Sequence, residues 1–61
     1  MPTRIAIAER QQLFREALRS LLESQSDFRV VCETGDGHHL ANLVAEHKPG
    51  VLLFDHNLHS R

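Results

Sequence analysis

An acidic residue closes a short apolar run near the C-terminal end of this 61-residue chain. Asp55 follows Val51–Phe54, and Pro49 and Gly50 open the run. A run of this kind predicts a strand that is buried on both faces. In open parallel sheets, ligands and chemistry collect at the carboxyl ends of the strands. Asp55 is therefore the first candidate for a functional residue.

The histidines are the second group of residues that could do chemistry, and five are many for this length. His56 and His59 stand three positions apart, directly after Asp55, and the three side chains could approach a soft divalent metal. No cysteine lies at a local spacing that would complete such a site. The alternative, which we favour, is that the histidines are solvated on loops and helix faces.

Three strands and two helices are expected to position these residues. We predict strands at Arg4–Ala8, Phe28–Glu33 and Val51–Phe54, and helices at Gln11–Ser24 and His38–Lys48. The first helix carries an apolar stripe, expected to make core or dimer contacts, that consists of Leu13, Phe14, Ala17, Leu18, Leu21 and Leu22. Asp36 or Gly37 can cap the second helix, and Pro49 with Gly50 ends it.

The order strand, helix, strand, helix, strand with short connections is typical of a parallel sheet. Right-handed crossovers place the first strand between the other two. We therefore expect one α/β domain over residues 1–61, with a three-stranded sheet in the order 2-1-3 and one helix on each face. Val51–Phe54 is then a fully apolar strand at an open edge, which invites pairing with another chain. The chain is either a piece of a larger sheet or a homodimer in which two such edges meet antiparallel.

Composition argues against several classes of function. The net charge is -1, the basic residues are scattered, and there is no Trp or Tyr to stack on bases, so we expect no direct nucleic-acid binding by this segment. No apolar run approaches the roughly 18 residues of a membrane span. Cys32 has no partner for a disulfide and the N-terminus does not resemble a signal peptide, which favours the cytoplasm. Without a nucleophile–base pair or a cofactor loop, we do not expect an enzyme.

Three segments of the chain, in order, resemble a known family. They are Arg4–Leu18, Asp27–Gly37 and Val51–Asp55. These segments are similar to the opening strand and helix, the second strand with its turn, and the phospho-acceptor strand of response-regulator receiver domains of the NarL/FixJ group. The resemblance covers essentially all 61 residues. It implies half of a flavodoxin-like receiver fold, whose sheet order is 2-1-3-4-5, ending before the strands that carry the family's hydroxyl residue and lysine.

The resemblance implies that the chain is the receiver part of a two-component transcriptional regulator whose DNA-binding part lies outside these residues. Asp55 would be the phospho-acceptor, phosphorylated by a histidine kinase with the help of Mg²⁺. The metal ligands would be Glu9, Asp55 and the backbone carbonyl of Asn57. Arg10 departs from the family, because it replaces the acid that ligates the metal directly, and an arginine cannot bind a cation.

Arg10 leaves two interpretations of the chain open. In the first, the receiver is degenerate: Arg10 pairs with Asp55, and Mg²⁺ binds poorly because two unit charges at about 4 Å interact by roughly 4 kcal/mol at an effective dielectric constant near 20. In the second, the chain is a dimerisation or partner-docking module that uses the Val51–Phe54 edge without phosphorylation. The state of Asp55 separates a receiver that signals through phosphorylation from a module that only dimerises or docks a partner.

Overall fold

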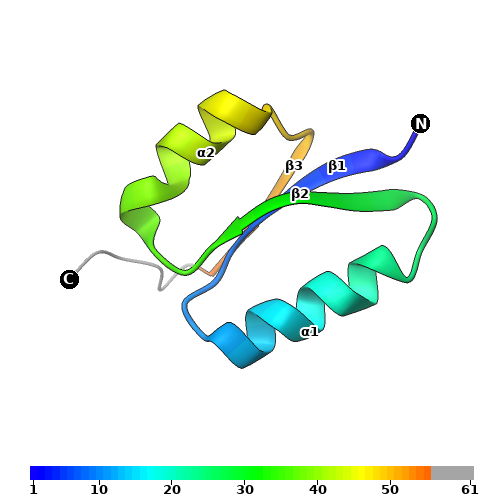
Figure 1. Ribbon diagram of the computed structural model, residues 1–61, viewed down its shortest axis with the longest axis horizontal. Helices are drawn as coiled ribbons and strands as arrows, with labels where there is room; N and C mark the ends of the chain where they lie inside the picture. The colour runs from blue at the N-terminus through cyan, green and yellow to red at the C-terminus, as the bar shows by residue number, and fades with distance from the viewer. Residues whose placement is uncertain (56–61) are drawn as a thin grey trace.

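The structure, a computed structural model, describes residues 1–55 of the chain. Its elements are β1 (Thr3–Ala8), α1 (Gln12–Glu23), β2 (Phe28–Thr34), the short 3₁₀ helix η1 (Gly37–His39), α2 (Leu40–His47) and β3 (Val51–Phe54). The strands form one parallel sheet in the order β2-β1-β3, with α1 and α2 on opposite faces (Figure 1). The predicted α/β fold, the strand order and the edge position of the second strand are confirmed.

The central strand β1 holds the core. Among the described residues, the buried apolar side chains are Ile5, Ala6, Ile7 and Ala8, each at most 2% exposed. Two large side chains alternate with two small ones, so successive residues fill the two faces of the sheet differently. The core is therefore one strand wide, and the outer strands and both helices cover it.

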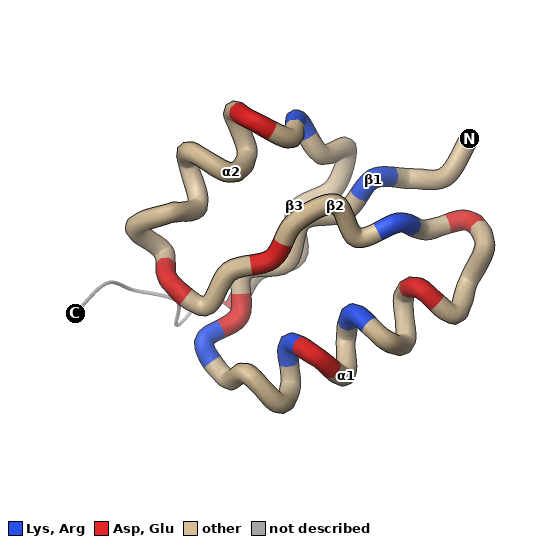
Figure 2. The backbone as a smooth tube through the Cα atoms, viewed as in Figure 1, with Lys and Arg blue, Asp and Glu red and all other residues tan. Residues whose placement is uncertain are grey.

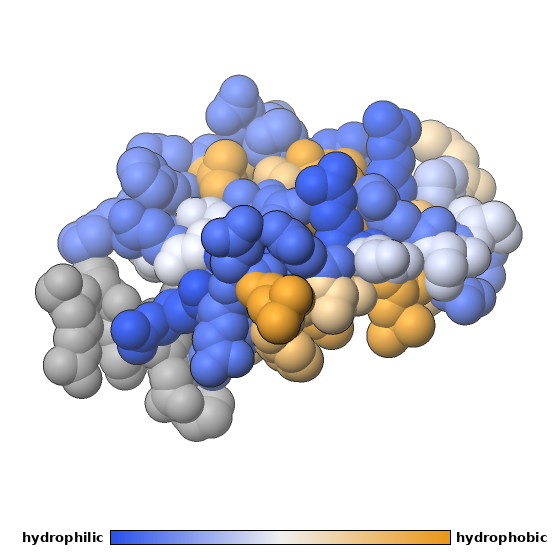
Figure 3. All heavy atoms as spheres, turned by 60° about the horizontal axis from the view of Figure 1, so that its bottom comes forward, coloured by the Kyte–Doolittle hydropathy of each residue, from blue (hydrophilic) through white to orange (hydrophobic). Residues whose placement is uncertain are grey.

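Helix α1 buries less of its apolar stripe than the sequence predicts. Leu18 and Leu22 are half-buried, but Leu13 is 81% exposed, Leu21 64% and Phe14 52%. The prediction of core contacts is wrong for these three, because a sheet of three strands is too narrow to cover a stripe this wide. Apolar side chains accordingly reach the surface on the α1 side of the molecule (Figure 3). Their alternative role as dimer contacts stays a prediction.

Strand β3 is also more exposed than predicted. Its four residues are 36–62% exposed, with Phe54 the most accessible. The sequence suggested a strand buried on both faces, but within residues 1–55 β3 pairs with β1 on one side only. The position at the edge of the sheet, and not the composition, sets this exposure. Within the described part of the chain, no helix is long and apolar enough to span a membrane.

The second predicted helix divides into η1 and α2. Asp36 caps η1 as expected, since its Oδ1 accepts a hydrogen bond of 2.9 Å from the backbone N–H of His38. α2 ends where Lys48 adopts a left-handed conformation with φ of 49°, and the Lys48 N–H donates to the Val44 carbonyl. The guanidinium of Arg4 donates to the carbonyl of His47, which ties this helix end to β1.

Candidate functional site at the carboxyl edge of the sheet

Glu9 and Asp55 lie at the same edge of the sheet, directly after two neighbouring strands. The Asp55 N–H donates to the Ala8 carbonyl at 3.0 Å, which continues the pairing of β1 with β3 by one residue. The Glu9 N–H donates to the Thr34 carbonyl at 2.9 Å, which continues the pairing of β1 with β2. Both acids are thus held by the sheet itself, as the sequence predicted from their positions after strands.

The two acids line one cleft of about 330 Å³. The remaining described residues that line it are apolar: Ile7, Ala8, Phe14, Leu18, Leu53 and Phe54. They come from β1, β3 and the first half of α1, so the cleft lies on the side of the sheet that α1 covers. Its lining combines two carboxylates with an apolar wall, a setting in which charge interactions are stronger than in water.

Glu9 is the one buried charged residue among the described residues, at 7% exposed. Two contacts hold it besides its place in the sheet. Its Oε1 accepts a hydrogen bond of 3.2 Å from the Gln11 N–H, and its backbone carbonyl accepts a 2.6 Å bond from Nη1 of Arg15. A buried carboxylate without a partner would be costly, so the Gln11 bond helps to satisfy it, while the Arg15 bond holds the backbone.

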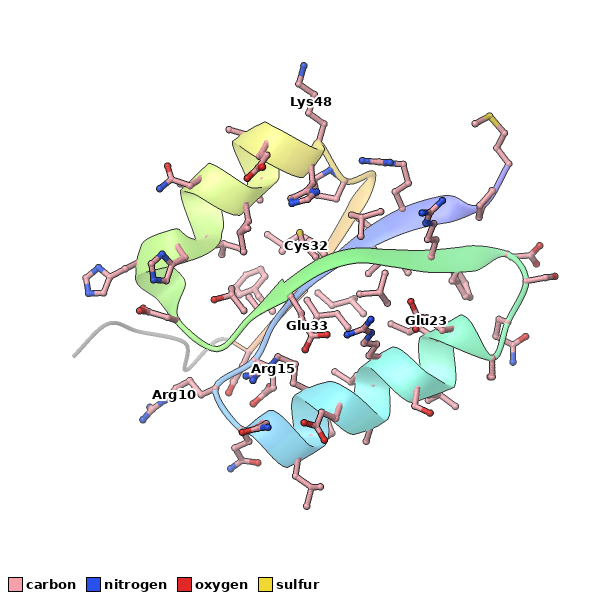
Figure 4. All side chains as sticks on the ribbon, in the orientation of Figure 1. Arg10, Arg15, Glu23, Cys32, Glu33 and Lys48 are labelled. Carbon is pink, nitrogen blue, oxygen red and sulfur yellow. The ribbon has the colours of Figure 1, made fainter. Side chains whose placement is uncertain are left out.

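Arg10 does not form the predicted pair with Asp55. The ion pairs within residues 1–55 do not include one between these two side chains, and the Arg10 side chain points away from the body of the protein (Figure 4). Arg10 lies at a bend outside β1 and is exposed, so its long side chain carries the guanidinium into solvent. Position 10 therefore supplies no carboxylate to the edge.

The described residues do not by themselves form a metal centre. In residues 1–55 no group of three or more His, Cys, Asp or Glu side chains could hold an ion. Glu9 and Asp55 provide two carboxylates, and the Glu9 carboxylate already accepts the Gln11 N–H, so this donor set fits the near-octahedral demand of Mg²⁺ poorly. Asn57, His56 and His59 lie outside the described residues, and the roles predicted for them stay predictions.

Arg15 is a residue of this edge that the sequence analysis missed. Its Nε pairs with Oε1 of Glu33 at 3.1 Å, while Arg19 pairs with the other oxygen of Glu33 at 2.6 Å. The Arg15 side chain is only 17% exposed, although Arg15 lies outside the apolar stripe of α1. The sequence contains a feature that could have indicated this role: Arg15 and Arg19 stand one turn apart on α1, so both can form ion pairs with one acid on a neighbouring strand.

The charges elsewhere are mixed in sign. Acidic and basic residues are interspersed along α1 and around the sheet, without a block of one sign in the part of the chain that is described (Figure 2). The hydrogen bond and the charge of Glu33 raise the pKa of Arg19, with a smaller contribution from Glu23. Burial raises the pKa of the Cys32 thiol in β2, and this effect is reduced by Arg4 and reinforced by Glu46.

Two curated proteins are similar to the chain. One is the uncharacterized transcriptional regulatory protein YxjL of Bacillus subtilis (strain 168), 42% identical over 52 residues, which are 85% of this chain and 24% of the relative. The other is the transcriptional regulatory protein DegU of Brevibacillus brevis, 37% identical over 54 residues, which are 88% of this chain and 23% of the relative. The chain spans about a quarter of the length of these relatives. No family model and no solved structure matches it.

Proposed function

We propose that this chain is the first part of a receiver-type module of a two-component transcriptional regulator, with Asp55 at the phospho-acceptor position. One observation carries the proposal: Asp55 and Glu9 end neighbouring parallel strands and line a common cleft. Ligands and reacting groups collect at this edge in open α/β sheets. The similarity to two transcriptional regulatory proteins over most of the chain supports the same assignment.

The site is degenerate in this proposal, because position 10 holds an arginine. Phosphoryl transfer to a carboxylate needs a divalent cation to neutralise the charge of the transferred group. Position 10 supplies no acid, so Glu9 and Asp55 are the two acids that line the cleft among residues 1–55, which is a small donor set for Mg²⁺. The chain as it stands therefore binds Mg²⁺ weakly and takes up little phosphoryl group from a histidine kinase or a small phosphodonor.

The test is to restore the missing acid. The binding is followed by amide chemical shifts, and at millimolar Mg²⁺, with or without beryllofluoride, we expect no shift changes in the natural chain. Arg10→Asp should gain Mg²⁺ binding at millimolar concentration, because a third carboxylate then joins Glu9 and Asp55. The gain should vanish in the double variant Arg10→Asp with Asp55→Asn. Binding by the natural chain would refute the degeneracy, and Arg10→Asp without any gain would refute the site.

A matched control separates the local effect from the general change of charge. Arg29 is also an exposed arginine, but it lies near the amino end of β2, at the opposite end of the sheet. Arg29→Asp changes the net charge by the same amount and should leave Mg²⁺ binding unchanged. A similar gain in both variants would mean that the ion responds to the overall charge and not to a site at Asp55.

The exposed strand β3 favours a second candidate function. Its apolar side chains are 36–62% exposed along an unpaired edge, which is a ready template for another strand. In this alternative the chain acts as a dimerisation or docking module, through two β3 edges that meet antiparallel about a two-fold axis. It differs from the first proposal in one measurable respect: association would not depend on the chemistry of Asp55.

A further inference from the structure

We propose that Arg15 is the positioning residue of the carboxyl edge, and that Gly35 is required because it leaves room for the Arg15 guanidinium. The inference rests on the proposed function in one respect: the group that Arg15 positions is Glu9, one of the two acids of the cleft. It assigns a role to α1 (Gln12–Glu23) beyond covering the sheet. Figure 4 shows Arg15 between this helix and the loop that leads into it.

Arg15 joins three parts of the chain that meet at the edge. From α1, its Nη1 donates to the carbonyl of Glu9 at 2.6 Å, and its Nε donates to the carboxylate of Glu33 on β2 at 3.1 Å. A guanidinium is suited to this task, since its planar fork offers several donors in fixed directions. Arg15 and Glu33 are 17% and 23% exposed, so solvent screens this pair less than a surface pair.

The Glu9 carbonyl is the point through which Arg15 acts on the site. The N–H of Glu9 is fixed to β2, and the Glu9 carboxylate accepts the Gln11 N–H. The bond to Arg15 removes the remaining rotation of the peptide that follows Glu9. With that peptide fixed, the Glu9 side chain stays turned into the cleft. Arg15 is not among the described residues that line the cleft, so it acts through Glu9.

Gly35 supplies an independent observation for the same inference. A Cβ at this position would lie 2.5 Å from Nη1 of Arg15. The backbone does not require glycine here, since no glycine among the described residues has a positive φ. A Cβ at position 35 would therefore compete with the Arg15 guanidinium for the same space, and it would also lie 3.4 Å from the carbonyl oxygen of Glu9. An alanine would push the guanidinium aside, because the end of a flexible side chain yields before the backbone does.

The test compares Arg15→Met with Arg19→Met. Both variants remove a guanidinium from the same helix and a contact to Glu33, but Arg19 does not touch the loop after β1. We expect Arg15→Met to raise amide hydrogen exchange at Glu9 and Gln11 by about tenfold, which corresponds to a hydrogen bond worth about 1.4 kcal/mol. Arg19→Met should leave these two amides unchanged. Equal effects of the two variants would overturn the proposal.

A double-mutant cycle tests the link between Gly35 and Arg15. In the natural chain and in Arg19→Met, Gly35→Ala should raise the unfolding equilibrium constant by about tenfold, through loss of the Arg15 bonds. In Arg15→Met the same change should be neutral or lower the constant by about two- to fivefold, since alanine restricts the unfolded chain. An unchanged effect of Gly35→Ala in Arg15→Met would overturn the proposal. If Arg15→Met does not fold, hydrogen exchange of the Gln11 amide in Gly35→Ala decides instead. Faster exchange than in the natural chain supports the proposal, and unchanged exchange overturns it.

A metal titration separates failure of this proposal from failure of the proposed function. In the Arg10→Asp background, Arg15→Met should weaken Mg²⁺ binding by about tenfold, while Arg19→Met should not weaken it. If Arg10→Asp binds Mg²⁺ and Arg15→Met does not weaken it, the positioning role fails and the proposed function stands. If Arg10→Asp binds no Mg²⁺ at all, the proposed function fails. The role of Arg15 is then still decided by the amide hydrogen exchange and by the double-mutant cycle.

Discussion

Ile7 belongs both to the core and to the lining of the cleft. Truncating its side chain tests most directly whether β1 supplies most of the stability of this fold. It is the largest fully buried side chain among the described residues, at 1% exposed, and it also lines the cleft. Ile7→Ala removes about three buried carbon atoms, which at ~0.8 kcal/mol each gives roughly 2.4 kcal/mol. The residual cavity adds to this, so a total of about 2–5 kcal/mol is expected.

A loss near the upper end of this range should unfold much of the population, and a loss near the lower end should shift the urea midpoint while the chain stays folded in water. Native domains are stable by about 5–15 kcal/mol, and chains of about 60 residues lie at the low end because they bury a small share of their surface. Ile7→Val should cost about 0.5–1.5 kcal/mol and leave the chain folded. Far-UV circular dichroism in urea is the suitable assay, since the chain has no Trp or Tyr. One protein concentration must be used throughout, because self-association would add to the apparent stability.

Leu13→Ala is the control for Ile7→Ala. It removes the same number of carbon atoms from a large aliphatic side chain, but Leu13 is 81% exposed on α1. A change within about 0.5 kcal/mol is expected for a surface position of this kind. The reasoning would be refuted if the two variants lost equal stability, or if Ile7→Ala lost less than about 1 kcal/mol. Either result would mean that β1 is not the core.

Two further predictions concern β3 and Cys32. Sedimentation should show the natural chain as a dimer and Leu52→Lys as a folded monomer, because lysine at an edge strand opposes pairing. Leu21→Lys, on the exposed face of α1, should remain a dimer. If Leu21→Lys is the monomer and Leu52→Lys the dimer, the interface lies on α1. Since burial raises the pKa of the Cys32 thiol, the folded state binds more protons than the unfolded state between the usual pKa of about 8.5 and the raised value. Stability should therefore fall as the pH rises through this window, and alkylation at pH 8 should be slower than in urea. Equal alkylation rates would contradict the burial of this thiol.

The sheet order could be predicted from the sequence because it depends on few features. Short connections and the alternation of strands with helices leave a right-handed arrangement with the first strand in the centre. The register irregularity of β2 could not be predicted. Ile5 pairs with Val30, but Ala6 pairs with Cys32, so one residue of β2 is passed over. The periodicity of a strand describes its own two faces and carries no information about where its neighbour shifts.

The degree of burial could not be predicted for the same physical reason in α1 and β3. The apolar pattern of each shows which side chains seek cover, but the cover depends on how many strands lie beside them. With three strands, Leu13 and Phe54 stay largely exposed although their patterns are typical of a core. The apolar pattern of these elements therefore did not predict which of their side chains are covered.

The two acids of the site were predictable, and its arginines were not. Glu9 and Asp55 each follow a strand directly, so the topology alone places them at one edge. Arg10 was expected beside Asp55, but it lies at an exposed bend after β1, where its long side chain extends into solvent. Arg15 was missed because one of its partners is a backbone carbonyl, which has no signature in the sequence, and the other is Glu33, 18 positions away.

The two candidate functions share residues, and this determines which variants can distinguish them. Leu53 and Phe54 belong to the exposed edge and also line the cleft that holds Glu9 and Asp55. A strand that pairs with β3 would therefore border the cleft, and by linkage any effect of pairing on ligand affinity is matched by an equal effect of the ligand on pairing. Substituting Phe54 changes both properties at once and cannot separate them.

Leu52 is 36% exposed on the same strand but is not among the described residues that line the cleft, so Leu52→Lys alters the edge while leaving the lining in place. If Leu52→Lys in the Arg10→Asp background abolished Mg²⁺ binding together with association, the acid site would require the paired edge, and the two functions would be one.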